Sequence, residues 1–200
     1  MVKIVLSHDE RTEIKDLRDA GVFQEINTAL LENMRSGTIF IPCADGHHFG
    51  DLFTYHTQIC GHKDEQLHHP LSLNGGALLI PNESPLLRRE DGSRRHDDAV
   101  LLENLVGAIQ LKQPKAVILY AHAPCGMARL HRLSIHNECA LLFTAKDRIR
   151  NATKDLDVPD LRVWFHVYDS DKTVPYATYH LNRGSWSAYP QTARNLLSAA

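Results

Sequence analysis

Residues 38–47 read TIFIPCADGH, an apolar run that ends abruptly in side chains that can bind metal. The apolar half is typical of a buried β-strand. Cys43, Asp45 and His47 follow it within five residues. The sequence therefore predicts a strand whose carboxyl end presents a thiol, a carboxylate and an imidazole.

A second stretch repeats this arrangement at residues 116–126, which read AVILYAHAPCG. Cys thiolates and His nitrogens suit a borderline-soft ion such as zinc. A catalytic zinc usually takes three protein ligands and keeps a fourth position for water or substrate. Cys43, His122 and Cys125 supply three ligands. Asp45 lies where it can fill or guard the fourth position.

The rest of the chain alternates amphipathic helical patterns with short apolar runs. The pattern predicts helices over residues 9–36 (broken near Gly21), 46–60, 97–113, 134–151 and 191–200, and strands over 38–43, 71–80, 115–121, 161–168 and 174–181. Such alternation favours an α/β fold with a mainly parallel central sheet flanked by helices.

The two ligand clusters make a geometric demand on this sheet. Ligands of open α/β sheets bind outside the carboxyl ends of the strands, where the strand order reverses. Both clusters come just after such strand ends. One ion can reach both clusters only if the two strands are neighbours, so we expect the strands over 38–43 and 115–121 to be adjacent.

The composition predicts a single α/β domain over residues 1–200, with residues 1–37 as a helical N-terminal arm. With 22 basic and 24 acidic residues, the net charge of −2 argues against a nucleic-acid-binding protein. No apolar run reaches membrane-spanning length, and the first residues lack the pattern of a secretory signal. We therefore expect a cytoplasmic protein that acts on a small molecule. Six of the 13 histidines fall within residues 47–69, and most of them are interpreted as part of a polar loop region rather than as a buffering rim around a site.

The ligand motifs resemble those of the β-class carbonic anhydrases. That family carries Cys-x-Asp-Ser-Arg after its first core strand and His-x-x-Cys-Gly after a later one. Here the first is CADGH at residues 43–47, and the second is intact as HAPCG at residues 122–126. Residues 74–76 (NGG) resemble the Asn-Ala-Gly turn of the family, and the late strand ending at Asp169 is similar as well.

The resemblance implies a zinc-dependent lyase that reversibly hydrates carbon dioxide to bicarbonate by attack of zinc-bound hydroxide. Zinc allows this near neutral pH because it lowers the pKa of bound water from about 15.7 to about 7. In the family the motif Asp either ligates zinc or pairs with the motif Arg and leaves water on the metal. Asp45 is therefore expected as a zinc ligand or as a catalytic group. The resemblance also implies a homodimer or larger homo-oligomer, in which the helical arm can pack on a partner.

The first motif departs from the family pattern at two positions. His47 replaces the Arg, and Gly46 replaces the Ser. His47 is shorter than Arg, and its charge depends on pH. Either His47 is a catalytic residue that replaces the Arg as the partner of Asp45, or Asp45 coordinates zinc, or the substrate preference has changed. Two alternatives to carbon dioxide hydration stay open: a zinc hydrolase of carbonyl sulfide or carbon disulfide, and a zinc-binding protein with little hydratase activity.

Overall fold

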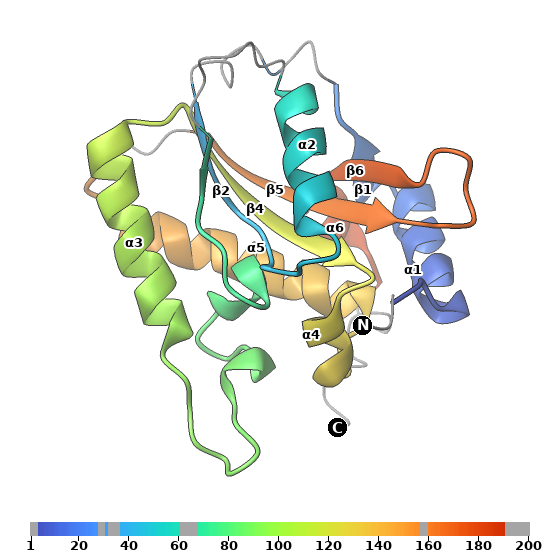
Figure 1. Cartoon of the computed structure of the whole chain (residues 1–200), viewed down its shortest axis with the longest axis horizontal. Helices are drawn as coiled ribbons and strands as arrows, with labels where there is room; N and C mark the ends of the chain where they lie inside the picture. The colour runs from blue at the N-terminus through green and yellow to red at the C-terminus, as the bar shows by residue number, and fades with distance from the viewer. Residues whose placement is uncertain (1–3, 28–30, 32–36, 61–67, 157–159, 191–200) are drawn as a thin grey trace.

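A six-stranded sheet forms the centre of the molecule in the computed structural model (Figure 1). The structure describes residues 4–27, 31, 37–60, 68–156 and 160–190. The strands run in the order β1-β6-β5-β4-β2-β3. Their bounds are β1 Phe23–Glu25, β2 Thr38–Ile41, β3 His68–Pro70, β4 Ala116–Ala123, β5 Asp160–Tyr168 and β6 Tyr176–Leu181.

The sheet is mainly parallel, as the sequence predicts. β3, β2, β4 and β5 pair in parallel, whereas β6 and β1 join the β5 edge in antiparallel fashion. β2 and β4 are direct neighbours, with Ile41 opposite Leu119, so the expected adjacency of the two ligand strands is confirmed. After β2, the next strand in the chain, β3, lies on one side of β2, whereas the following strands β4 and β5 lie on its other side. The strand order therefore reverses between β2 and β4.

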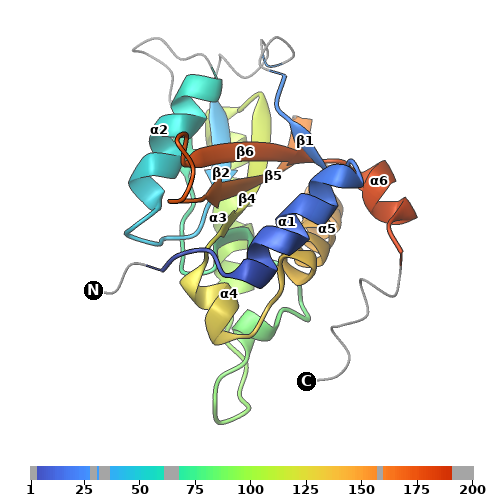
Figure 2. The same ribbon diagram turned by 90° about the vertical axis from the view of Figure 1, so that its right-hand side faces the viewer.

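Helices cover both faces of this sheet. Their bounds are α1 His8–Asp19, α2 Phe49–Ile59, α3 Asp97–Lys112, α4 Gly126–Leu130, α5 Ile135–Ala152 and α6 Arg183–Ala188. Figures 1 and 2 show α2 on one face and α5 on the other. The helices predicted over 46–60, 97–113 and 134–151 are thus confirmed. No helix among the described residues is long and apolar enough to cross a membrane.

The alternation of side chains along the strands divides the core into two layers. Val117, Leu119 and Phe165 belong to the large cluster that includes residues of α1 and α5. Tyr120 and Trp164, which point to the opposite face, join a smaller cluster with Leu52 of α2. Because residues of one parity share a face, His122 of β4 and His166 of β5 also lie on the α2 face.

The N-terminal segment differs from the predicted helix over residues 9–36. α1 begins at a capping box formed by Ser7 and Glu10, and it ends before Gly21, whose φ is +69°. Phe23–Glu25 then form β1, which pairs with β6. The prediction that residues 1–37 form a helical arm is therefore wrong where the chain forms β1. Residues 28–30 and 32–36, like the helix predicted over 191–200, lie outside the described residues.

The apolar run at residues 71–80 also differs from its prediction as a strand. Cys43 forms an isolated parallel bridge with Leu73, but the chain then turns and forms a 3-10 helix, η2, over Gly76–Leu79. Gly75 and Gly76 have φ values of +101° and +51°, in the left-handed region that glycine tolerates. The turn thereby lies directly against the end of β2 and supports the position of Cys43.

We expect Gly76→Ala to destabilise the fold strongly. A Cβ at Gly76 would lie 2.5 Å from the Cys43 backbone nitrogen, in addition to the strain of its positive φ. The free energy of unfolding should fall by about 3 kcal/mol. Gly92→Ala is the matched control, because φ is +79° there but no atom lies within 4 Å of an added Cβ. It should cost only about 1 kcal/mol. Urea unfolding measures both, and equal losses would contradict the role given to the contact with Cys43.

Candidate metal centre

The carboxyl ends of β2 and β4 bring three ligand side chains together. Cys43 follows β2 by two residues, His122 lies at the end of β4, and Cys125 precedes the first residue of α4. Their ligand atoms all lie within 4.8 Å of one another. Tetrahedral zinc separates S and N ligands by about 3.3 to 3.8 Å, so a small contraction would let one ion contact all three.

The burial and bonding of these side chains fit a metal. Cys43, His122 and Cys125 are 6%, 3% and 2% exposed. Among the described residues, neither ring nitrogen of His122 has a partner that meets hydrogen-bond geometry. A buried imidazole without a partner costs free energy that a metal ion would recover. Both thiols are free rather than joined in a disulfide, so both can serve as ligands.

The surroundings shift the pKa values of the two thiols in opposite directions. The pKa of Cys43 is lowered to about 4, first because the Cys125 thiol donates a hydrogen bond to its sulfur, then through the His122 ring and the Gly75 N–H, against the opposing effect of burial. The Gly75 N–H lies 3.1 Å from the Cys43 sulfur. The same contact with Cys43, together with burial, raises the pKa of Cys125. Cys43 therefore ionises more readily than Cys125, and a thiolate at Cys43 would attract a cation.

The other two cysteines differ from this pair. Burial raises the pKa of Cys60 to about 12 and raises that of Cys139 as well. Neither belongs to a group of three metal-ligating side chains within the described part of the chain. We therefore interpret both as parts of the apolar core.

Asp45 and His47 lie outside the group of three ligands. The Asp45 carboxylate accepts a hydrogen bond from the backbone N–H of His47 at 2.8 Å, which closes a local turn. Asp45 is partly buried, whereas His47 is exposed. Asp45 therefore follows Cys43 in a local turn and stays outside the ligand group. Its role as a ligand or catalytic group, and the catalytic role of His47, stay predictions.

His48 is a residue of this region that the sequence analysis missed. It is only 3% exposed, and its ring centroid lies 5.5 Å from that of His122 and 5.1 Å from that of Tyr168. Burial, and next the nearby His122, lower the pKa of His48. The interpretation of residues 47–69 as mostly polar loop is thus wrong at His48, and also at His56, which is fully buried in α2.

His166 adds a third imidazole to the same end of the sheet. It lies opposite His122 in the β4–β5 register and is 1% exposed. Its Nδ1 forms a hydrogen bond with Thr178 at 2.8 Å. Burial, with His122 and His48 nearby, lowers the pKa of His166 to about 3, so the ring is neutral. The partial alternation of the strand over 161–168 contained the signal for its position, because residues 164, 166 and 168 share one face.

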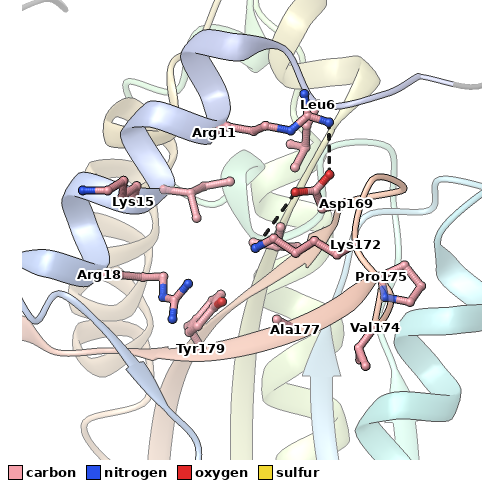
Figure 3. Close-up of a pocket in the computed structure, with 12 residues that line it drawn as sticks. Leu6, Arg11, Lys15, Arg18, Asp169, Lys172, Val174, Pro175, Ala177 and Tyr179 are labelled. Carbon is pink, nitrogen blue, oxygen red and sulfur yellow. Dashed lines mark hydrogen bonds and ion pairs between the residues drawn. The ribbon is translucent and has the colours of Figure 1, made fainter.

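A separate cavity of about 140 Å³ lies between α1 and the β5–β6 hairpin (Figure 3). Arg11, Lys15, Arg18 and Lys172 line it, together with Asp169. Figure 3 shows Asp169 between Arg11 and Lys172, and the Arg11–Asp169 ion pair measures 3.0 Å. No Cys or His lines this cavity, so the metal ligands belong to a different part of the molecule.

Comparison with known proteins gives likenesses only among solved structures. No protein-family model matches the chain, and no curated protein matches it. A β-carbonic anhydrase of the fungus Aspergillus fumigatus is 16% identical with a TM-score of 0.42, over 80% of this chain and 99% of that one. A carbonic anhydrase of Streptococcus mutans is 13% identical with a TM-score of 0.41, over 90% and 100%. A β-carbonic anhydrase of Trichomonas vaginalis is 12% identical with a TM-score of 0.41, over 88% and 99%. At these values the likenesses establish neither a family nor an activity.

Removing one ligand should abolish metal binding. We expect Cys43→Ser and His122→Ala to lose the ion, because two remaining ligands hold zinc far more weakly than three. Metal analysis after dialysis against zinc measures the ion content of each variant. Cys139→Ala is the control, since Cys139 is buried in α5 outside the ligand group, and it should keep one zinc per chain. Stoichiometric zinc in the Cys43 and His122 variants would show that the ion binds elsewhere.

Proposed function

We propose that this chain is a zinc-dependent enzyme that reversibly hydrates carbon dioxide to bicarbonate, with zinc held by Cys43, His122 and Cys125. One observation carries the proposal above all others. Two thiols and a buried imidazole converge within 4.8 Å, at the carboxyl ends of adjacent parallel strands. The motif resemblance, His-x-x-Cys-Gly intact and Cys-x-Asp in place, supports the choice of reaction.

The chain's own residues supply the setting for this chemistry. When bound, zinc supplies a Lewis acid that makes water a nucleophile near neutral pH. Cys43 and Cys125, as thiolates, offset the charge of the ion. The Gly75 N–H holds the Cys43 sulfur at 3.1 Å, and a contact of this kind orients a ligand and tunes its basicity. Asp45 either occupies the fourth position or orients the nucleophile from beside it.

The first motif also favours a second candidate function, the hydrolysis of carbonyl sulfide or carbon disulfide. His47 stands where the family's Arg would hold Asp45, and its side chain is exposed rather than packed on that carboxylate. The observed contact to Asp45 comes from the His47 backbone. A site without the Arg orients Asp45 differently. Because Asp45 orients the reacting groups, such a site would suit a linear substrate other than carbon dioxide. The replacement of the Arg by His47 is equally compatible with a zinc-binding protein that has little hydratase activity.

A stopped-flow assay separates these functions. We expect zinc-loaded protein to accelerate carbon dioxide hydration, and His122→Ala to reduce the rate to that of the uncatalysed reaction. The same preparations are assayed with carbonyl sulfide and carbon disulfide. Turnover of carbonyl sulfide or carbon disulfide without turnover of carbon dioxide would overturn the hydratase and support the hydrolase. No turnover of any substrate by stoichiometrically loaded protein would leave only the zinc-binding function.

The role of Asp45 is tested in the same assay. Asp45→Ala should lower kcat/KM by at least about tenfold, because an oriented acid–base group contributes substantially to proton transfer. His47→Arg should raise it, since a bidentate Arg would hold the Asp45 carboxylate in one position. The measurement is a pH–rate profile for the parent and both variants. If Asp45→Ala keeps full activity and an unchanged profile, Asp45 neither guards nor assists the site.

A further inference from the structure

We infer that His48, rather than His47, is the residue that positions a small molecule or anion in the fourth position of the metal centre. The inference rests on the metal centre of the proposed function and adds a residue to it. His48 would hold the exchangeable ligand by a hydrogen bond from its imidazole, on the side of the centre that Cys43, His122 and Cys125 leave open.

The backbone fixes His48 at the start of α2. Its N–H donates to the Asp45 carbonyl at 3.1 Å, and its own carbonyl accepts from the Leu52 N–H at 2.9 Å. These bonds tie His48 both to the loop that follows Cys43 and to the first turn of the helix. Its side chain is thereby directed inward at the strand ends, whereas the side chain of His47, one residue earlier, is exposed.

The ring of His48 lies next to the centre but is not one of its ligands. Its centroid is 5.5 Å from the His122 centroid, yet His48 does not belong to the group whose ligand atoms lie within 4.8 Å of one another. His48 therefore lies beside the ligand group rather than in it, near enough for its ring to contact a small molecule bound at the metal. The Tyr168 ring also packs against His48, with a centroid distance of 5.1 Å, and limits the movement of the imidazole.

Several buried imidazole nitrogens near the centre have no hydrogen-bond partner among the described residues. The Nδ1 atom of His48 and the Nε2 atom of His166 are buried and have no hydrogen-bond partner among the described residues. Together with His122, they concentrate unused polar atoms at one end of the sheet. Buried nitrogens of this kind are costly unless a ligand or ion satisfies them. A small molecule bound at the metal would give the His48 ring the partner that the described residues do not supply.

The experiment uses cobalt-substituted protein, because the visible spectrum of Co²⁺ responds to a change of ligand. Thiocyanate is titrated into the parent, His48→Leu, His48→Asn and His47→Leu, and its Kd is read from the spectrum. We expect all four to bind one Co²⁺ per chain. His48→Leu should weaken thiocyanate binding about tenfold, as the loss of one hydrogen bond predicts. His48→Asn, which keeps a donor, should fall between, and His47→Leu should stay within about twofold of the parent.

The outcomes separate this inference from the proposed function. An unchanged Kd in His48→Leu overturns the inference alone, as does an equal loss in His47→Leu. Loss of cobalt from His48→Leu but not from His47→Leu would make His48 a metal ligand and likewise overturn it. A parent that binds metal and hydrates carbon dioxide still supports the proposed function in each of these cases. A parent that binds no metal overturns both.

Discussion

The pairing of β2 with β4 is the constraint on which the candidate site depends. The Cys43 and His122–Cys125 segments lie far apart in sequence, and each brings too few ligands to hold an ion. Parallel pairing, with Ile41 opposite Leu119, aligns the two strand ends and places all three ligand atoms within 4.8 Å. The strand order reverses between these strands, which is where open α/β sheets form binding crevices. The register of one strand pair thus determines whether the centre exists.

A close backbone contact supports the end of β2 beside the site. The turn at Gly75 and Gly76 lies against the end of β2 and leaves no room for a Cβ at Gly76. The same turn directs the Gly75 N–H to the Cys43 sulfur. One glycine therefore permits the approach, and its neighbour stabilises the thiolate. The same turn therefore packs against the end of β2 and contributes to the lowered pKa of Cys43.

The sequence predicted the sheet and the grouping of Cys43, His122 and Cys125 because each depends on a regular pattern. Apolar runs that end in Cys or His reveal strand ends, and helical periodicity reveals the helices between the strands. Prediction from the sequence failed where contacts between distant parts of the chain determine the structure. β1 has only three residues and exists through its pairing with β6. The apolar run at 71–80 resembles a strand, but two positive φ values turn it into η2. The exposure of His47 and burial of His48 follow from how α2 begins, which no periodicity reveals.

The contrast among the buried histidines distinguishes a site from a polar core. His56 lies on the same face of the sheet, fully buried, and forms hydrogen bonds of 2.9 Å with both Tyr120 and Thr38. The fold can therefore bury an imidazole and satisfy both of its nitrogens. At the carboxyl ends of the strands it leaves ring nitrogens of His48, His122 and His166 without partners among the described residues. Each such atom costs about 1 to 3 kcal/mol. A metal and its ligand would recover that cost, so metal binding should also stabilise the folded chain.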